Sequence, residues 1–389
     1  MAVFFFTESC SKFLCGANCE LLAEVNKKIV PLFSTTSNTS KIMIAAKAYA
    51  AHSATDKLTE WSFERREVGP NDVQIEILYC GVCHSDIHQV RNEWGGSKFP
   101  MVPGHEIVGR ITKIGENVAK FKVGDLAGIG CLVDSCRECK QCTQGNEHFC
   151  EKGASGTYNS FEQDKKTPTY GGYSNTIVCT EGFAVKVSEK LPLDAVAPLL
   201  CAGITTFSPL RKWKVGKGHK VAVLGLGGLG HMAVKFAVAF GAEVTVLSTS
   251  ANKQDDAKRL GAHNFCNTKN ADDVKQYTNY FDFIVDTVSA PHNYDMYLKM
   301  LAPNGVQICV GIPPEPISMN GFLLLGKNRS LVGSTIGGIP ETQEMLDFCA
   351  EHNIVSDVEV ININYINEAY ERILKSDVKY RFVIDLATL

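Results

Sequence analysis

The 389-residue sequence lacks the features that mark membrane proteins and nucleic-acid-binding proteins. No apolar run approaches the roughly 20 residues that a helix needs to cross a bilayer. Charge of neither sign dominates, because 39 Lys and Arg face 42 Asp and Glu and the formal net charge is −3. We therefore expect no membrane partner and no nucleic-acid partner. The sequence also has no internal repeat and no low-complexity linker.

Residues 1–42 lack the composition of the common targeting segments. They contain no Arg but do contain Glu8, Glu20 and Glu24, whereas a transit peptide is rich in Arg and poor in acids. A secretory signal needs a basic start before its apolar core, and that start is missing as well. We expect this extension to be disordered and the protein to be cytoplasmic, with organellar targeting by residues 1–42 left open.

Cysteine, by contrast, is abundant, with 15 residues. Clustered cysteines in a reducing compartment more often bind metal than form disulfides. The densest cluster has the spacing C-x2-C-x2-C-x7-C, and four thiolates at this spacing can close around one tetrahedral zinc with no open position, as in a structural site. Its members are Cys136, Cys139, Cys142 and Cys150. Cys131 lies outside the pattern, and we expect it to pack in the core.

The apolar pattern divides the chain into two regions, as its length also suggests. Residues 44–185 carry short alternating runs such as 73–77 and 109–114, which predict half-buried strands in a β-rich domain. Later, an apolar run at 220–224, a glycine turn, a helical stretch and a second apolar run at 243–247 form one βαβ unit of a parallel sheet. Further strands are expected at 281–286, 306–311 and 330–333, and helices at 198–210, from 340 to about 351 and around 367–375.

A glycine-rich turn follows the first apolar run of this unit. It reads Gly225, Leu226, Gly227, Gly228, Leu229, Gly230 and therefore matches GxGxxG. In a strand–turn–helix context the first glycine permits the tight turn, the second lets the backbone approach a pyrophosphate, and the third lets helix and strand pack closely. The helix N-terminus adds free N–H groups for the phosphates. We predict a nicotinamide dinucleotide site here.

The end of the second strand predicts which coenzyme binds. An NAD site usually has an acid about 20 residues beyond the glycines, whereas this strand ends in Ser248, Thr249 and Ser250, followed by Lys253. Hydroxyl groups and a cation suit a 2′-phosphate because they donate hydrogen bonds and balance its charge. We therefore expect NADP(H). The alternative is a solvated turn before a helix.

A second set of metal-ligating residues is dispersed along the chain. Cys83, His105 and Cys201 could form a three-ligand zinc site with an open fourth position for water or a substrate oxygen. Spacing alone does not establish this set, because a single His beside Gly is more often structural than a ligand.

Taken together, these motifs resemble the zinc-dependent medium-chain alcohol dehydrogenase family, in particular its cinnamyl-alcohol-dehydrogenase-like branch and the broad-specificity NADP(H)-dependent aldehyde reductases. The resemblance covers residues 43–389. It rests on the four-cysteine cluster and on the segments 81–86, 104–106, 200–206, 225–230 and 333–338. It implies an α/β protein with a Rossmann doubly wound parallel sheet and a β-rich, chaperonin-10-like catalytic domain. The expected domains are a catalytic zinc domain at 43–201 and 340–389 and a dinucleotide-binding domain at 202–339.

The resemblance also implies roles for individual residues. Catalytic zinc would sit on Cys83, His105 and Cys201, with a second, structural zinc on the four-cysteine cluster. Glu106 would lie next to the catalytic zinc and could exchange onto it, and Asp86 would orient His105. Ser85 would hydrogen-bond the reacting oxygen, the coenzyme ribose would pass the proton on, and His88 would exchange it with solvent.

Five further positions match residues that contact coenzyme or substrate in this family. Thr205, Val310 and Gly311 would face the nicotinamide, Arg381 would reach a phosphate, and Trp94 would line the substrate pocket, with core packing as its alternative. A homodimer that acts on small aldehydes and alcohols is implied as well. One departure is that cinnamyl alcohol dehydrogenases carry a bulky pocket tryptophan where this sequence has Ala154-Ser155-Gly156, which favours general aldehyde reduction.

Four other functions are weighed against this one. A polyol dehydrogenase of the same fold usually replaces the third zinc ligand with Glu, and a zinc-free quinone reductase lacks both zinc sets. A non-catalytic nucleotide-binding relative would be expected to lose Cys83, His105 or Ser85, and all three are present. An NAD-dependent enzyme of the same fold also remains an alternative.

Overall fold

The computed structural model describes residues 43–311 and 313–389, which belong to one unit. The extension 1–42, for which disorder is expected, lies outside the described residues. In the described ranges no single helix is long and apolar enough to cross a membrane, and only the bent pair Leu193–Leu200 and Ala202–Lys212 would together meet that requirement, by length and composition.

A seven-stranded sheet dominates the β-rich region. Its order is β16-β17-β3-β4-β5-β9, with β8 also pairing with β3, and every pair except β16–β17 is antiparallel. Alternation decides the faces: on β3, Val73, Ile75 and Ile77 are buried and Glu76 is exposed. The strands are β3 (Asp72–Gly81), β4 (Ile107–Ile114), β5 (Leu126–Ile129), β8 (Thr176–Thr180), β9 (Val185–Lys186), β16 (Val358–Asn362) and β17 (Arg381–Asp385).

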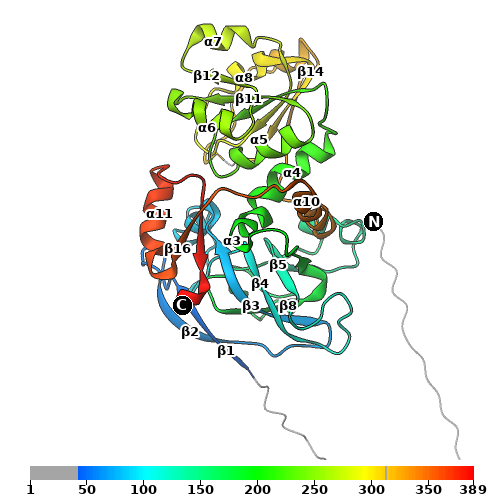
Figure 1. Ribbon diagram of the computed structural model, residues 1–389, viewed down its shortest axis with the longest axis vertical. Helices are drawn as coiled ribbons and strands as arrows, with labels where there is room; N and C mark the ends of the chain where they lie inside the picture. Colours follow the sequence, from blue (N-terminus) through cyan, green and yellow to red (C-terminus); the bar gives the residue numbers. More distant parts are fainter. Residues whose placement is uncertain (1–42, 312) are drawn as a thin grey trace, which may run out of the picture. The chain divides into compact units, whose positions relative to one another are not determined.

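Two short two-stranded sheets accompany it, formed by β1 (Ile44–Ala50) with β2 (Thr59–Arg65) and by β6 (Leu132–Asp134) with β7 (Ser155–Gly156). The C-terminal strand β17 pairs with β3, opposing Val383 to Gly81, so the red end of the chain lies beside the blue β3 in Figure 1. The C-terminal strand is therefore an integral part of the β-rich region.

The second sheet has six strands, all parallel, in the order β12-β11-β10-β13-β14-β15. This is the doubly wound order, and it confirms the predicted Rossmann sheet. Val221, Ala222 and Val223 of β10 are all fully buried, because helices cover both faces of a parallel sheet. The strands are β10 (Lys220–Leu224), β11 (Glu243–Ser248), β12 (Asn264–Asn267), β13 (Phe281–Asp286), β14 (Leu301–Cys309) and β15 (Ser330–Gly333).

Helices α5 to α8 surround this sheet in Figure 1. The helices of the described chain are α1 (His84–Val90), α2 (Lys140–Thr143), α3 (Leu193–Val196), α4 (Ala202–Lys212), α5 (Gly230–Ala239), α6 (Gln254–Arg259), α7 (Ala271–Gln276), α8 (Tyr294–Met300), α9 (Phe322–Leu325), α10 (Ile339–His352) and α11 (Ile366–Leu374). Short 3-10 helices are η1 (Glu147–Phe149), η2 (Glu181–Phe183), η3 (Ala197–Leu200), η4 (Ala251–Lys253), η5 (Ile363–Tyr365) and η6 (Leu386–Thr388).

The helix predicted over 198–210 is interrupted at Cys201. The 3-10 helix η3 ends at Leu200, α4 begins at Ala202, and Cys201 between them has φ −129° and ψ −68°. The continuous helical prediction is therefore wrong at this residue. The break matters because it takes Cys201 out of the helical register just before α4.

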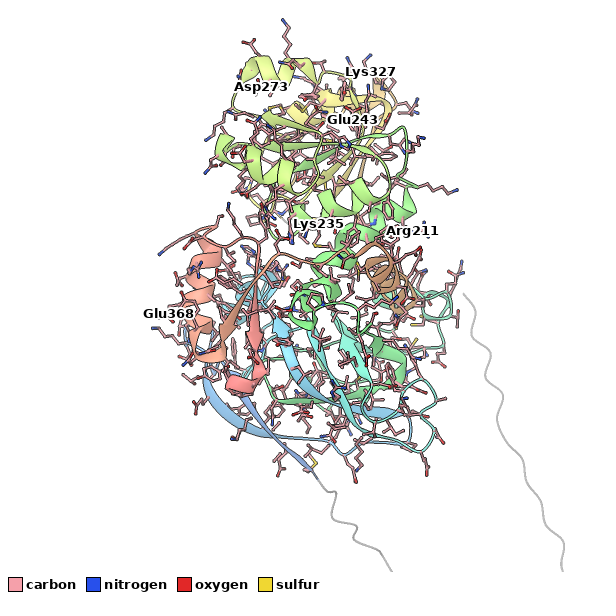
Figure 2. All side chains as sticks on the ribbon, viewed as in Figure 1. Arg211, Lys235, Glu243, Asp273, Lys327 and Glu368 are labelled. Carbon is pink, nitrogen blue, oxygen red and sulfur yellow. The ribbon has the colours of Figure 1, made fainter. Side chains whose placement is uncertain are left out.

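The two sheets share a hydrophobic core. One cluster of buried side chains contains Val108 and Val383 of the seven-stranded sheet together with Val221 and Val223 of the parallel sheet. Polar contacts add to it: Lys235 on α5, labelled in Figure 2, donates to the carboxylate of Asp357 at 2.6 Å. The strands of the seven-stranded sheet fall within the expected ranges 43–201 and 340–389, and those of the parallel sheet fall within 202–339. The domain boundaries themselves stay a prediction.

Candidate active site

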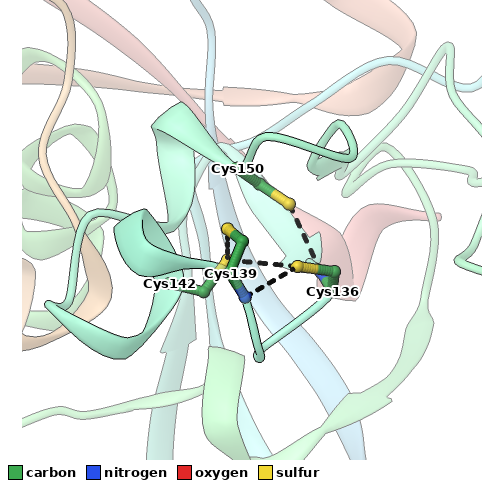
Figure 3. Close-up of side chains that lie close together, drawn as sticks. All are labelled: Cys136, Cys139, Cys142 and Cys150. Carbon is green, nitrogen blue, oxygen red and sulfur yellow. Dashed lines mark hydrogen bonds between the residues drawn. The ribbon is translucent and has the colours of Figure 1, made fainter.

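The four-cysteine cluster lies in the loop between β6 and β7 (Figure 3). One sulfur from each of Cys136, Cys139, Cys142 and Cys150 lies within 4.8 Å of the others. Cys139 is the N-cap of α2 and Cys142 lies within this helix, which brings their sulfurs to 3.4 Å. The Cys136 and Cys142 sulfurs are 3.9 Å apart. The predicted cluster is thus assembled in space by the local fold alone.

Backbone N–H groups point at these sulfurs. Cys136 N–H donates to Cys150 Sγ at 3.4 Å, Cys139 N–H to Cys136 Sγ at 3.4 Å, and Glu151 N–H to Cys139 Sγ at 3.5 Å. Backbone N–H donors from Cys142 and Glu151 lower the pKa of the Cys139 thiol to about 6. Donors aimed at sulfur stabilise thiolate, which is the form that binds zinc.

The dispersed residues Cys83, His105 and Cys201 also converge. Together with Glu106 they offer ligand atoms that all lie within 4.8 Å of one another. Cys83 is the N-cap of α1, His105 precedes β4, and Cys201 occupies the break before α4. Three separate segments therefore supply the group, which is why spacing in the sequence could not establish it.

Asp86 holds one side of this group in place. It is fully buried, and its carboxylate accepts hydrogen bonds from Cys83 N–H (2.9 Å), Gly104 N–H (3.1 Å) and Tyr173 OH (3.2 Å). Its Oδ1 also lies 3.1 Å from His105 Nδ1. That contact leaves His105 Nε2 as the free ring nitrogen, so the placement fits the orienting role expected for Asp86.

Glu106 and Arg381 form a buried ion pair beside the group. Arg381 Nη2 donates to Glu106 Oε1 at 2.5 Å and to Val82 O at 2.8 Å. The other oxygen, Oε2, has no hydrogen-bond partner among the described residues. A Cβ on Gly81 would lie 1.9 Å from it, so only glycine fits there. Burial raises the pKa of Glu106 to about 8, against the opposing effect of the Arg381 guanidinium.

Ser85, His88 and Trp94 lie on α1 and just beyond it. Ser85 Oγ is 3.7 Å from Cys83 Sγ, so this hydroxyl adjoins the metal-ligating group. His88 is further out: its Nδ1 contacts Glu93 Oε2 at 2.5 Å, and its ring stacks on Trp94 with 4.8 Å between centroids. Trp94 is 46% exposed, so the alternative of core packing for this residue is wrong.

The glycine turn shows why each glycine is needed. Gly225 has φ +88°, in the left-handed region that glycine favours. A Cβ on Gly230 would lie 2.1 Å from the Gly225 carbonyl, and one on Gly228 would lie 2.9 Å from Arg381 Cδ. Nothing lies within 4 Å of the Cβ position of Gly227, which leaves its backbone approachable. Leu229 is the N-cap of α5, whose N-terminus faces this turn.

The end of β11 places the residues expected to select the coenzyme. Ser248 is buried and its hydroxyl accepts from Ser250 N–H at 3.1 Å, whereas Thr249 and Ser250 are exposed. Lys253 reaches back to the glycine turn, where its Nζ donates to Leu226 O at 2.8 Å. Burial lowers the pKa of Lys253. The amine therefore lies beside the turn and lacks a carboxylate hydrogen-bond partner among the described residues.

Three further residues were expected to face the nicotinamide. Thr205 is buried on α4, one turn after Cys201, whose carbonyl accepts its N–H at 2.9 Å. Val310 and Gly311 follow β14, and both donate their N–H to Asp286 O, at 2.9 and 3.1 Å. Thr205 thus lies beside a residue of the metal-ligating group, and Val310 and Gly311 lie at the C-terminal end of a parallel strand.

Two residues of this region have contacts with the site that were not predicted from the sequence. Cys131, expected to be a packed core cysteine, is only partly buried, and its interaction with Cys201 raises the pKa of the Cys201 thiol. His231 follows the glycine turn and is fully buried; its Nδ1 faces Gly227 O at 3.2 Å and its Nε2 faces Ser356 Oγ at 3.0 Å. Burial lowers the pKa of His231 to about 3, so its ring is neutral and fastens the turn to the C-terminal segment. Its position directly after the motif was the one clue in the sequence.

Comparison with known proteins agrees with this architecture. Residues 69–189 match the family model of the alcohol dehydrogenase GroES-like domain, and residues 228–351 match that of the zinc-binding dehydrogenase. NADP-dependent alcohol dehydrogenase C 1 of Mycolicibacterium smegmatis is 54% identical over 348 residues, covering 89% of this chain and 99% of the relative. Aldehyde reductase YahK of Escherichia coli is 54% identical over 345 residues, covering 88% of this chain and 99% of that protein.

A solved structure from the same family has the same fold as this chain. The cinnamyl alcohol dehydrogenase (CAD) of Helicobacter pylori, crystallised with NADP(H), superimposes with a TM-score of 0.84 at 44% identity, covering 89% of this chain and 99% of that chain. Both the sequence relatives and the fold thus extend over nearly the whole described chain. The protein is a member of the zinc-binding alcohol dehydrogenase family, with a GroES-like domain and a Rossmann-type zinc-binding dehydrogenase domain.

Proposed function

We propose that the protein is a zinc-dependent aldehyde reductase that interconverts aldehydes and primary alcohols with NADP(H). The observation that carries this proposal is the double contact of Arg381. Its guanidinium bonds to Glu106 of the metal-ligating group, while its aliphatic part packs against Gly228 of the glycine turn. One side chain therefore links the metal-ligating group to the dinucleotide turn. This link supports a single site in which hydride would pass between the nicotinamide and the carbonyl carbon of the substrate.

The residues fit two zinc ions per chain. The closed set of four thiols suits a structural zinc, and Cys83, His105 and Cys201 suit a catalytic zinc with an open position. The unpartnered Oε2 of Glu106 supports this assignment, because a buried carboxylate oxygen without a donor is costly unless a cation is near. When bound, the zinc would supply Lewis acidity toward a carbonyl oxygen, and NADP(H) would supply or accept the hydride.

The protein's own side chains would position the reactants and move the proton. Ser85 would exchange a proton with the reacting oxygen through Oγ, which is next to Cys83. His88, partly exposed and held by Glu93 and Trp94, would exchange that proton with solvent. Thr205, Val310 and Gly311 would bound the nicotinamide side, with Asp86 keeping His105 in its ring orientation.

A broad range of aldehydes is the proposed substrate class. Trp94, nearly half exposed beside His88, would offer a flat apolar surface to a substrate chain or ring. The bulky side chain associated with cinnamyl alcohol substrates is absent here, because the chain has the small residues Ala154, Ser155 and Gly156 in its place. Relatives named as aldehyde reductase and NADP-dependent alcohol dehydrogenase support general aldehyde reduction.

A homodimer is proposed as the assembly. Strand β15 is an edge of the parallel sheet, with β14 as its one neighbour among the described strands. Near it the chain exposes large apolar side chains, with Phe322 and Leu325 of α9 each 79% exposed. An open strand edge beside exposed apolar groups is a pairing surface, and a second copy would cover it by a two-fold axis.

The proposed function is tested by coenzyme oxidation in the purified, zinc-loaded protein, with benzaldehyde and a medium-chain aliphatic aldehyde as substrates. We expect turnover with NADPH and little with NADH. Turnover with NADH alone would retain the dehydrogenase and overturn the coenzyme preference. No turnover with either coenzyme would contradict the proposal and favour a non-catalytic relative.

Replacing Lys253 with alanine should weaken NADPH binding by roughly 10- to 100-fold, because a charge-assisted contact to phosphate contributes about 1.5–3 kcal/mol. NADH, which lacks the 2′-phosphate, should bind nearly as before. Titration of both coenzymes by nicotinamide fluorescence measures the difference. Lys258→Ala is the matched control, because Lys258 is an exposed lysine on α6, the helix that Lys253 precedes. Equal losses for the two coenzymes would refute the 2′-phosphate assignment.

A further inference from the structure

The loop between β13 and α8, residues 287–293, packs against the proposed coenzyme site. A Cβ on Gly225 would lie 3.0 Å from Thr287 Oγ1, and one on Gly311 would lie 2.5 Å from Val288 O. Thr287 also donates to Leu224 O through both its N–H (3.1 Å) and its hydroxyl (2.8 Å). This loop therefore forms the wall behind both the glycine turn and the segment after β14.

Asp286, the last residue of β13, organises this wall. Its backbone carbonyl accepts the N–H groups of Val310 and Gly311. Its carboxylate is 1% exposed and accepts from His292 Nε2 (2.9 Å), Gln307 Nε2 (2.9 Å) and Val288 N–H (3.2 Å). The residue lies between β10 and β14 in the sheet, at the point where the strand order reverses and dinucleotides bind.

His292 closes the loop onto Asp286. One ring nitrogen, Nε2, faces the carboxylate, and the other, Nδ1, lies 2.8 Å from the Ala290 carbonyl. Carboxylate and carbonyl oxygens can only accept, so both ring nitrogens must donate, and only the imidazolium can do that. The hydrogen bond to Asp286 raises the pKa of His292 against the effect of burial, in agreement with this geometry.

Among the described residues, the other neighbours of the ring carry no charge that competes with Asp286. Its faces contact Tyr294, stacked at 4.3 Å between centroids, and Tyr297 at 5.7 Å. Burial raises the pKa of both phenols, so they stay neutral, and burial likewise raises the pKa of the nearby Cys309 thiol to about 12. Beyond the ring, Asn293 caps α8 by accepting Met296 N–H at 3.2 Å, which anchors the far end of the loop.

We propose that His292 is a positioning residue for the coenzyme: as an imidazolium held between Asp286 and the Ala290 carbonyl, it fixes residues 287–293 against the glycine turn. The inference rests on the proposed binding of NADP(H) to that turn. When the ring loses its proton, one nitrogen faces an acceptor with no hydrogen between them, and the loop is released. Protonation of the His292 ring thus favours binding of the coenzyme. By reciprocity, the bound coenzyme raises the proton affinity of the ring.

The test compares NADPH affinity in the wild-type protein and in His292→Gln, from pH 6 to pH 9. The pKa of the ring is raised above its ordinary value of about 6.5, so the wild-type affinity should be highest below this raised pKa and fall as the pH rises through it. The variant should bind about tenfold more weakly at low pH, since a charge-assisted hydrogen bond is lost, and its affinity should vary little with pH. KM for NADPH should rise more than kcat falls.

His263→Gln is the matched control, because this exposed histidine just before β12 accepts from Val244 N–H and lies outside the loop. A second measurement follows the wild-type ring directly, by NMR of histidine labelled with 13C, and expects NADPH to raise the pKa of His292. Equal affinities and pH profiles in wild type and His292→Gln, or a His292 titration that NADPH leaves unchanged, would overturn the inference. If the wild type binds neither NADPH nor NADH, the proposed function fails and the inference fails with it.

Discussion

In a Cys83→Ser protein, aldehyde-dependent oxidation of NADPH is expected to fall by at least about a thousandfold while the fold persists. Cys83 caps α1 and its sulfur belongs to the group formed with His105, Cys201 and Glu106. A serine hydroxyl is a poor substitute for thiolate at zinc, and Lewis-acid stabilisation of several kcal/mol corresponds to a rate factor of this size. The fold should persist because the backbone contacts of Cys83 with Asp86 do not depend on the sulfur.

Three measurements check this expectation together: steady-state turnover, zinc per chain by metal analysis, and thermal unfolding. Zinc should fall from two ions per chain to about one, with a small change in the unfolding midpoint. Cys266→Ala is the control, because this buried thiol of β12 belongs to neither metal-ligating group. Full activity in Cys83→Ser would refute the assignment of this group as the catalytic centre.

The second large effect concerns stability rather than chemistry. In Cys139→Ser the unfolding midpoint is expected to fall by roughly 10 °C or more, because a structural zinc contributes several kcal/mol to folding and each kcal/mol corresponds to about 2–4 °C in a domain of this size. Cys139 is central to its group: its sulfur lies 3.4 Å from that of Cys142, and its N–H donates to Cys136 Sγ. Without the Cys139 thiol, a loop with little apolar burial would lose the zinc ion that we propose closes it.

Thermal unfolding of the zinc-loaded protein, with and without a chelator, provides the measurement. Chelation should destabilise the wild type and shift Cys139→Ser much less, since the variant has already lost this ion. Cys179→Ala, a buried thiol on β8 in the same domain, is the control for removing a sulfur elsewhere. A midpoint unchanged in Cys139→Ser and insensitive to chelator in the wild type would show that the cluster binds no stabilising metal.

The three-dimensional arrangement also explains why some sequence interpretations were more secure than others. The four-cysteine cluster and the glycine turn are local, since each is assembled within one short segment by a turn and a helix start. The group of Cys83, His105 and Cys201 is not local, and its prediction depended on the resemblance to a family. The break before α4 that places Cys201 was missed, because its apolar neighbours on both sides are compatible with one continuous helix.

Much of the protein was determined by the sequence alone: the parallel sheet by its uninterrupted apolar strands, the β-rich region by its alternation, and the dinucleotide turn by glycines that a Cβ would obstruct. Tertiary structure decided which distant residues meet. The pairing of β17 with β3 brings Arg381 between Glu106 and Gly228. The strand order of the parallel sheet reverses at β13, and there the loop that follows Asp286 brings His292 behind the glycine turn. Local pattern reflects the backbone geometry and burial of one element, whereas contacts between elements depend on how several elements pack, and no short stretch of sequence encodes that packing.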